Sequence, residues 1–224
     1  MLVPQSAIRR RTAAHLTESL ATAAHALLVV DVDYGAVDRV RRDLGLTYLP
    51  FVARAVVEAV RAFPKVNGMS TTEGLVVSRD VHLGIAVDLG FEGLVVPVVH
   101  RASDLRLRAL AHAVENLAAA ARDRRLSADA LEGGTFTITN VGNYGTVSAA
   151  PIINHPQVAI LSIDGVRMRP AAVARPDGDW ALAVRPVGNL SLSFDHRVFD
   201  GAYAAAFLDR VRNELEHRDW DAER

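Results

Sequence analysis

The chain has 224 residues, of which 50% are hydrophobic and 23% are charged, and its formal net charge is −1 at pH 7. This length and composition suit one compact domain with a substantial core, and the near-neutral charge gives no sign of nucleic-acid binding. The absence of cysteine excludes a disulfide framework, a thiolate nucleophile and a zinc–thiolate site. No apolar stretch reaches about 18 residues and no signal-peptide core opens the chain, so we expect a cytoplasmic protein with no membrane partner.

Hydrophobic periodicity predicts helices and strands that alternate along the chain. The predicted helices are 6–25, 35–44, 49–63, 104–125 and 202–217. The predicted strands are 26–33, 75–78, 81–88, 94–99, 135–140, 157–163, 166–173, 180–185 and 189–194. Ser103 is the expected N-cap of the longest helix. With no internal repeat, linker or low-complexity tract, this order predicts one mixed α/β domain.

The segment Asp-His-Arg-Val-Phe-Asp-Gly at 195–201 lies between a predicted strand and a predicted helix. Histidine is the side chain best suited to accept a proton near neutral pH, and a strand-to-helix corner holds His196 from both sides. Asp200 occupies the position of a helix N-cap. Taken alone, the segment also fits a purely structural role: a corner at the surface in which Asp195 and Arg197 form a salt bridge and Asp200 caps the helix.

The second segment with chemical interest is Gly-Gly-Thr-Phe-Thr-Ile-Thr-Asn-Val-Gly at 133–142. It reads as a strand with turn residues at each end. Threonine is common in strands because its branched side chain packs well on a pleated surface. By itself this segment therefore does not indicate a site.

Together the two segments resemble the signatures of the acyltransferase (E2) subunits of 2-oxoacid dehydrogenase complexes. Asp-His-Arg-Val-x-Asp-Gly resembles the active-site signature, and 133–142 resembles the second signature, in which a serine or threonine follows Phe-Thr-Ile. Six further runs resemble other parts of the same catalytic domain: 3–10, 46–51, 63–67, 84–88, 93–98 and 151–161. We identify the whole chain, 1–224, as a single catalytic domain of this family.

The resemblance implies a chloramphenicol-acetyltransferase-like fold, a mixed α/β sandwich in which helices back a mixed β-sheet. It implies a homotrimer, with a larger core assembly built from trimers as a further expectation. In such trimers the active site forms between subunits, where the histidine of one chain faces the serine or threonine of its neighbour. The expected reaction transfers an acyl group between the thiols of dihydrolipoamide and coenzyme A.

The resemblance also assigns roles to individual residues. His196 is the expected general base for the attacking thiol, and Thr139 the expected donor to the oxyanion of the tetrahedral intermediate. Asp200 is expected to fix the local geometry, although a capping role explains the same residue. Asp195 and Arg197 are expected to form a structural ion pair. No metal is expected.

Four residues fall near positions that line the coenzyme A path in the family: Arg41, Thr47, Asp88 and Asn140. Arg41 is expected to meet a phosphate of the nucleotide end, and the three polar residues to hold the pantetheine amides. Each also has a plain structural interpretation, as a solvated helix charge, a helix N-cap or a turn residue.

The chain shows neither a lipoyl domain nor a subunit-binding domain, and its only lysine, Lys65, does not suit lipoylation. We therefore expect an excised core or a stand-alone relative whose lipoyl group comes from another domain or chain, with the E1 and E3 components as partners. Two other interpretations stay open: an O-acetyltransferase resembling the chloramphenicol enzyme, and a catalytically silent structural core. The acyl group itself is not predicted, because one methylene changes binding by only about 1–3 kcal/mol.

Overall fold

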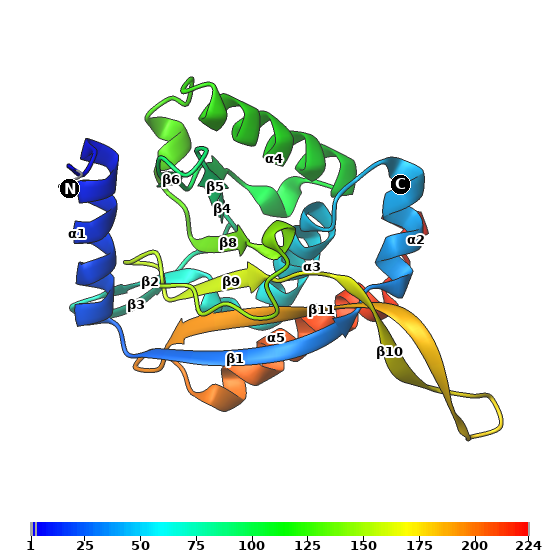
Figure 1. Ribbon diagram of the computed structural model, residues 1–224. Coiled ribbons are helices and arrows are strands. Elements are labelled where there is room, and N and C mark those ends of the chain that lie inside the picture. The colour runs from blue at the N-terminus through cyan, green and yellow to red at the C-terminus, as the bar shows by residue number, and fades with distance from the viewer. Residues whose placement is uncertain (1, 3, 224) are drawn as a thin grey trace.

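A mixed β-sheet forms the centre of the computed structural model, which describes residues 2 and 4–223 (Figure 1). Residues 1, 3 and 224 lie outside this description, including Val3 of the family-like run 3–10. The strand order in the sheet is β1-β11-β9-β8-β4-β7, and β10 pairs with β11. Two further two-stranded sheets are formed by β2–β3 and β5–β6.

The helices are α1 (Ala7–Thr22), α2 (Gly35–Leu44), α3 (Leu49–Ala62), α4 (Leu107–Arg122) and α5 (Gly201–His217). The strands are β1 (His25–Asp33), β2 (Gly68–Thr71), β3 (Gly74–Val77), β4 (Leu83–Ile85), β5 (Val87–Asp88), β6 (Leu94–Val95), β7 (Val98–Val99), β8 (Phe136–Asn140), β9 (Ala159–Ile163), β10 (Arg167–Ala174) and β11 (Trp180–Asp195). Among the described residues, no helix is long and apolar enough to cross a membrane.

The long strand β11 organises the sheet. Its second half pairs antiparallel with β1 on one edge and with β9 on the other, and its first half pairs antiparallel with β10. β8 runs parallel to β9, and β4 runs parallel to β8. Parallel and antiparallel pairs thus occur in one sheet, which confirms the predicted mixed α/β fold.

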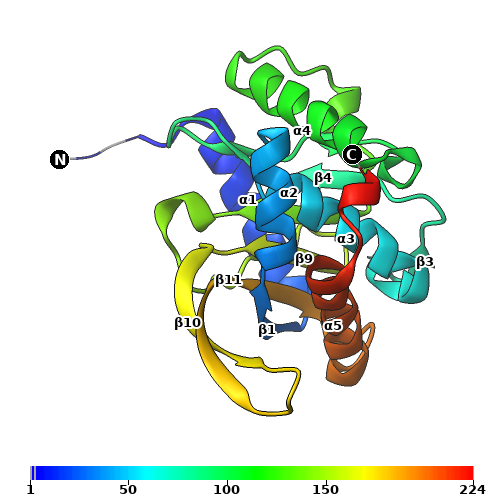
Figure 2. The ribbon, with the colours of Figure 1, turned by 90° about the vertical axis from the view of Figure 1, so that its right-hand side faces the viewer.

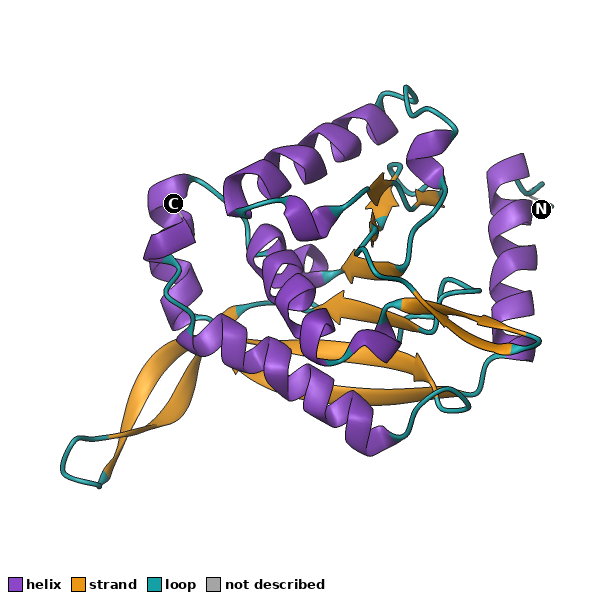
Figure 3. Cartoon of the chain, turned by 180° about the vertical axis from the view of Figure 1, so that it is seen from behind, coloured by secondary structure: helices purple, strands orange, loops and turns teal. Residues whose placement is uncertain are grey.

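The core lies between one face of the sheet and the helices α3, α4 and α5, which cover that face (Figure 3). Side chains alternate along β11, so Leu190, Leu192 and Phe194 point into the core and are buried. In α5, the buried ring of Phe207 lies 5.9 Å from that of Phe136 on β8. Burial of this apolar set is the main force that fixes the helices on the sheet.

The opposite face of the sheet is more polar, and the segment 141–158 covers part of it. Ser191 on β11 faces this segment, where its hydroxyl lies 3.2 Å from that of Ser148. α1 stands beside the sheet (Figure 1) and buries only Ser19, whose hydroxyl donates to the carbonyl oxygen of Ile153 at 2.6 Å.

Several predicted boundaries were wrong. Ser103 does not cap the longest helix, because 102–104 form a 3-10 turn and α4 begins only at Leu107. The predicted strands 180–185 and 189–194 are one strand, β11. Pro186 interrupts the apolar pattern, but its carbonyl oxygen still accepts a hydrogen bond from the backbone N–H of Tyr34 at 2.8 Å. The short strand β2 was not predicted.

Candidate active site

His196 lies at the corner that joins β11 to α5. Its backbone N–H donates to the carbonyl oxygen of Ala24 at 2.9 Å, which ties this corner to the start of β1. The imidazole is exposed, and its centroid lies 5.5 Å from that of the Phe194 ring. Within residues 2 and 4–223 neither ring nitrogen has a hydrogen-bond partner, so both are available to a substrate.

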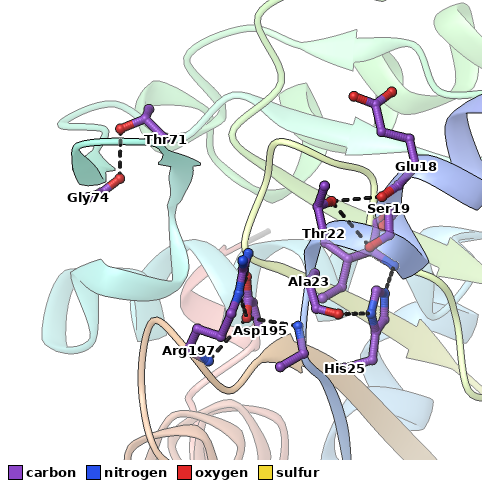
Figure 4. Close-up of polar contacts among 11 residues, drawn as sticks. Glu18, Ser19, Thr22, Ala23, His25, Thr71, Gly74, Asp195 and Arg197 are labelled. Atoms are coloured by element: carbon purple, nitrogen blue, oxygen red, sulfur yellow. Dashed lines mark hydrogen bonds and ion pairs between the residues drawn. The ribbon is translucent and has the colours of Figure 1, made fainter.

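The predicted ion pair between Asp195 and Arg197 is confirmed, and it holds the corner together (Figure 4). The Arg197 guanidinium donates to both carboxylate oxygens, through Nε at 3.0 and 3.1 Å and through Nη2 at 2.6 Å. The backbone N–H groups of Ala24 and Arg197 donate to the same carboxylate, each at 3.1 Å. Burial raises the pKa of Asp195, but these hydrogen bonds outweigh it and hold the pKa below its ordinary value.

We expect Arg197→Met to lower the free energy of unfolding by about 1–3 kcal/mol at pH 7, because the buried Asp195 carboxylate loses its charged partner. The folded-state pKa of Asp195 is depressed, so the contribution of the pair is complete above the unfolded value of about 3.9. It is lost as the pH falls through the folded-state pKa. The difference in free energy of unfolding between the wild type and the variant should therefore become smaller below pH ~4. Urea unfolding at a series of pH values measures this difference.

Arg210→Met is the matched control, because the side chains of Arg210 and Arg197 are both 50% exposed. Arg210 pairs with Glu214 one turn along α5, and such a helix-surface pair contributes only about 0.3–0.5 kcal/mol. Equal losses in the two variants would contradict the role assigned to Arg197.

Asp200 occupies the N-cap position of α5, as predicted, but its carboxylate makes no capping hydrogen bond. Its side chain is exposed, and only its carbonyl oxygen serves the helix, as acceptor for the N–H of Ala204 at 3.1 Å. Within the described part of the chain, helix capping therefore does not occupy this carboxylate.

Thr139 is the last but one residue of β8 and lines a cavity of about 550 Å³. Two other threonines lie close by, Thr137 in the same strand and Thr135 directly before it. Both hydroxyls are engaged: that of Thr135 donates to Asn67 and that of Thr137 to Gln157, each at 2.6 Å. Among the described residues, the Thr139 hydroxyl has no partner. Of the three, it alone is free to donate to a ligand.

The cavity beside Thr139 is lined mostly by apolar side chains, and its polar side chains come from α1, from β8 and from the segment 141–158. Its lining residues are Arg11, Thr12, His15, Leu16, Ala86, Leu94, Val96, Thr137, Thr139, Ala150, Pro151, Ile152, Asn154 and Ile160. The Nε2 atom of His15 lies 2.9 Å from the side-chain oxygen of Asn154. His15 was not predicted as a site residue, because a single histidine on a weakly amphipathic helix carries no recognisable signal.

His196 and Thr139 of one chain do not lie together. In the register of the sheet, Thr139 lies directly opposite Ser162 on β9, and Ser162 lies directly opposite Ser191 on β11. His196 follows Ser191 by five residues, or roughly 16 Å along the strand, and Thr139 lies two strands away. One chain therefore carries both groups without forming the site that would use them.

The residues expected on the coenzyme A path divide into two places. Arg41, Thr47 and Asn140 line one cavity of about 280 Å³. Asp88 is not among its lining residues. The Asp88 carboxylate accepts the backbone N–H groups of Gly90 and Phe91, which favours the turn role for this residue.

Arg41 is held in place within this cavity. Its guanidinium lies 4.2 Å from the centroid of the Tyr48 ring and 2.7 Å from the Asp38 carboxylate. Burial raises the pKa of Asp38, but hydrogen bonds from the Tyr48 hydroxyl and from Arg41 outweigh it and keep this pKa below its ordinary value. Asp164, buried at the cavity wall, accepts a hydrogen bond from Ser191 at 2.8 Å. Neither Tyr48 nor Asp164 was predicted, since each stands alone in the sequence.

His25 has a structural role. The backbone N–H of Ile153 donates to its Nε2 atom at 3.1 Å, so the ring proton lies on Nδ1, which is 3.2 Å from the carbonyl oxygen of Ala23. Figure 4 shows this contact near the Asp195–Arg197 pair. Within the described residues, no group of three or more His, Asp or Glu side chains is placed to hold a metal ion.

The model of the family "2-oxoacid dehydrogenases acyltransferase (catalytic domain)" matches residues 2–220. The chain belongs to this family. The resemblance drawn from the two signatures is thereby confirmed, and the match spans all the secondary-structure elements that carry the site.

Curated relatives of this acyltransferase family share about a third of their residues with the chain. One is the dihydrolipoyllysine-residue acetyltransferase component of the pyruvate dehydrogenase complex of Mycobacterium bovis, 37% identical over 97% of this chain and 41% of that protein. Another is the lipoamide acyltransferase component of the branched-chain alpha-keto acid dehydrogenase complex of Pseudomonas putida, 37% identical over 96% of this chain and 52% of that protein. The chain thus spans about half the length of these relatives or less.

Solved acyltransferase structures have the same fold. The cubic core of a pyruvate dehydrogenase multienzyme complex matches with a TM-score of 0.90 at 33% identity, over 99% of this chain and 93% of that chain. A dihydrolipoamide acetyltransferase of Azotobacter vinelandii matches with a TM-score of 0.89 at 32% identity, over 99% of this chain and 93% of that chain. Chloramphenicol acetyltransferase matches with a TM-score of 0.59 at 12% identity, over 91% of this chain and 94% of that chain. At this low identity, the match confirms the predicted fold and nothing further.

Proposed function

We propose that the chain transfers an acyl group between the thiols of dihydrolipoamide and coenzyme A. The observation that carries this proposal is the pair of unengaged groups at the two family signatures, the His196 imidazole and the Thr139 hydroxyl. The named activities of the relatives from Mycobacterium bovis and Pseudomonas putida support it.

His196 acts as the general base in this proposal. An ordinary thiol is mostly protonated at neutral pH, and only the thiolate attacks well. His196 takes the proton as the sulfur attacks the thioester carbonyl carbon. The carbonyl oxygen then becomes an oxyanion, to which Thr139 donates a hydrogen bond. When the carbon–sulfur bond of the leaving thiol breaks, His196 returns the proton to that sulfur.

A second copy of the chain supplies one of these two groups at each site. Our reason is the strand register, which separates His196 from Thr139 within one chain. We propose a homotrimer, and the assembled core formed by a solved relative supports a larger assembly of such trimers. The lipoyl group would come from a lipoyl domain in the same complex. The E1 and E3 components of that complex would be further partners.

Asp200 is proposed to support His196 across the corner. The study of the Azotobacter vinelandii enzyme concerns a serine, a histidine and an asparagine in its catalytic mechanism, with the histidine and asparagine four residues apart. His196 and Asp200 have the same spacing, and Asp200 has a carboxylate where that enzyme has an amide. The Asp200 carboxylate makes no capping hydrogen bond in the described part of the chain, and this supports a role for it at the site.

Coenzyme A is proposed as the second substrate, with part of the molecule in the cavity of Arg41, Thr47 and Asn140. A guanidinium that is fixed against an aromatic ring suits a phosphate of the nucleotide end, because less conformational freedom is lost on binding. Asp88, whose carboxylate is used by its own turn, is left out of this part of the proposal.

We expect Arg41→Met to raise the KM for coenzyme A about tenfold, with kcat and the KM for dihydrolipoamide little changed. The reason is that a phosphate contact made equally in the ground and transition states affects binding alone. Steady-state kinetics with each substrate varied in turn gives the three constants.

Arg42→Met is the control, since Arg42 also pairs with Asp38 but does not line this cavity. Both variants weaken the same ion-pair cluster. An equal rise of the KM for coenzyme A in both would mean that loss of the cluster, and not of a phosphate contact, is responsible.

The proposed function is tested with a panel of acyl-coenzyme A thioesters and free dihydrolipoamide as acceptor. Turnover with at least one acyl group is expected, and the panel also ranks the acyl chains. An absence of turnover with every donor, in a protein that is folded and trimeric, would overturn the proposal. Transfer to an alcohol under the same conditions would instead favour an O-acetyltransferase of the chloramphenicol type.

A further inference from the structure

Three consecutive arginines lie in the first turns of α1, the helix at the end of the sheet opposite to α2 (Figures 1 and 2). Two of them bond within the protein: Arg9 donates to the carbonyl oxygen of Phe91 at 3.0 Å, and Arg10 to that of Gln5 at 2.6 Å. Arg11 makes no hydrogen bond and no ion pair among the residues that the structure describes. It is exposed and lines the cavity of about 550 Å³, so its guanidinium is free to meet a ligand there.

The same cavity holds the Thr139 hydroxyl. Six polar side chains line it, and four of them bond within the protein: Thr12, His15, Thr137 and Asn154. In the described part of the chain, Arg11 and Thr139 are the two whose side chains have no partner. One is the oxyanion donor of the proposed reaction, and the other is a permanent cation.

The positive charge of Arg11 is not offset by the side chains around it. Within the described residues, no aspartate or glutamate lines the cavity. The positions three and four residues from Arg11 on α1, which are its neighbours on the helix surface, hold Ala7, Ile8, Ala14 and His15. The apolar wall of the cavity strengthens the attraction between this cation and an anion bound inside. The cavity therefore suits an apolar chain that ends in a negative charge.

The chemistry of the two substrates restricts what this anion can be. Dihydrolipoamide is uncharged, and near its thiol coenzyme A carries only the uncharged pantetheine amides. The phosphates of coenzyme A lie at its other end, which the proposed function assigns to Arg41 on α2, at the opposite end of the sheet from α1 (Figure 2). An anion beside Thr139 and Arg11 must then belong to the acyl group itself.

We infer that Arg11 selects an acyl group that ends in a carboxylate, the half-thioester of a dicarboxylic acid. The inference rests on the proposed function and names its acyl substrate. The thioester carbonyl oxygen faces Thr139, the methylene chain lies along the apolar wall, and the carboxylate pairs with the Arg11 guanidinium, which can donate two parallel hydrogen bonds. The acyl carbon passes from one sulfur to the other as before. The carboxylate takes no part in bond making and neither gains nor loses a proton.

Donors of matched shape test this selection. Succinyl-coenzyme A and 4-methylpentanoyl-coenzyme A differ in that the second has two methyl groups where the first has two carboxylate oxygens. With dihydrolipoamide as acceptor, we expect kcat/KM to favour the succinyl donor by about tenfold or more. Arg11→Met should abolish this preference by lowering kcat/KM for the succinyl donor alone.

Two further pairs cover shorter and longer acyl chains. They are malonyl with 3-methylbutanoyl, and glutaryl with 5-methylhexanoyl. If the wild type prefers the uncharged member of all three pairs, or does not distinguish the members of any pair, the inference is overturned.

Arg10→Met is the matched control, because Arg10 is the preceding residue of α1 and is also exposed but does not line the cavity. It should keep the wild-type preference. Arg11→Lys keeps the charge but not the two parallel donors, so it should retain part of the preference. Size-exclusion chromatography of each variant detects any loss of assembly. An equal loss of preference in Arg10→Met and Arg11→Met, with assembly intact, would overturn the role of Arg11.

Binding separates failure of this inference from failure of the proposed function. Isothermal titration of the wild type with each donor, in the absence of dihydrolipoamide, measures Kd without turnover. Binding of the succinyl donor about tenfold more tightly than its uncharged counterpart, lost in Arg11→Met, would support the inference even if no acyl transfer occurs. Turnover with equal kcat/KM for both members of every pair would refute the inference and leave the acyl transfer standing.

Discussion

Replacing His196 by alanine is expected to lower acyl transfer from coenzyme A to dihydrolipoamide by about 10²- to 10⁴-fold. The variant loses the group that takes the proton from the attacking thiol. The fold should be unaffected, because the imidazole is exposed and only the backbone N–H of His196 is used, in its bond to Ala24. Turnover at saturating substrate, compared with the wild type at matched protein concentration, measures the loss.

His217→Ala is the matched control for this experiment. His217 is also exposed and is the last residue of α5, the helix that follows the corner. Its replacement therefore removes an exposed histidine without changing the site. It should retain wild-type turnover. A His196→Ala variant that turns over as fast as His217→Ala would remove His196 from the mechanism.

The second large effect is expected for Thr139→Val, which keeps the shape of the side chain and removes its hydroxyl. We expect kcat to fall by about 10²- to 10³-fold, or about 2.7–4 kcal/mol of transition-state stabilisation. Both KM values should stay close to those of the wild type, because negative charge develops on the carbonyl oxygen only as the thiolate attacks. Steady-state kinetics separates kcat from KM.

Thr137→Val, two residues earlier on β8, provides the contrast. The Thr137 hydroxyl is buried and donates to Gln157 at 2.6 Å, so its removal should leave a buried acceptor unpaired and cost about 1–3 kcal/mol of unfolding free energy. Thr139→Val breaks no such bond and should unfold like the wild type. A stability loss in Thr139→Val, with kcat unchanged, would show that Thr139 is structural.

Much of the secondary structure could be predicted because burial imposes its period on the sequence. The helix 49–63 was located to within one residue as α3 (Leu49–Ala62), since its apolar residues recur at helical spacing and face the core. The start of α4 was misplaced because the 3-10 turn at 102–104 uses the same residue types as a helix start. β11 was divided because Pro186 and Gly188 usually end a strand, whereas here pairing with β1 and β10 continues across them.

The candidate site was predicted as a set of residues, but its arrangement was not. The sequence indicates His196 and Thr139 through their signatures, and a threonine by itself does not reveal whether its hydroxyl is free. The structure distinguishes Thr139 from Thr135 and Thr137, because only the latter two have partners inside the fold. It also groups Arg41 with Thr47 and Asn140 and leaves Asp88 at its own turn, which depends on contacts between distant segments.

By itself, the sequence determined the family, the mixed α/β class and the identity of the candidate base and oxyanion donor. These depend on short-range order, because residue types at set spacings and the period of apolar residues can be read along the chain. Only the tertiary structure decided that His196 and Thr139 of one chain lie apart, both along the strands and across the sheet. Strand register sets these distances, and register results from the packing of the whole sheet against its helices.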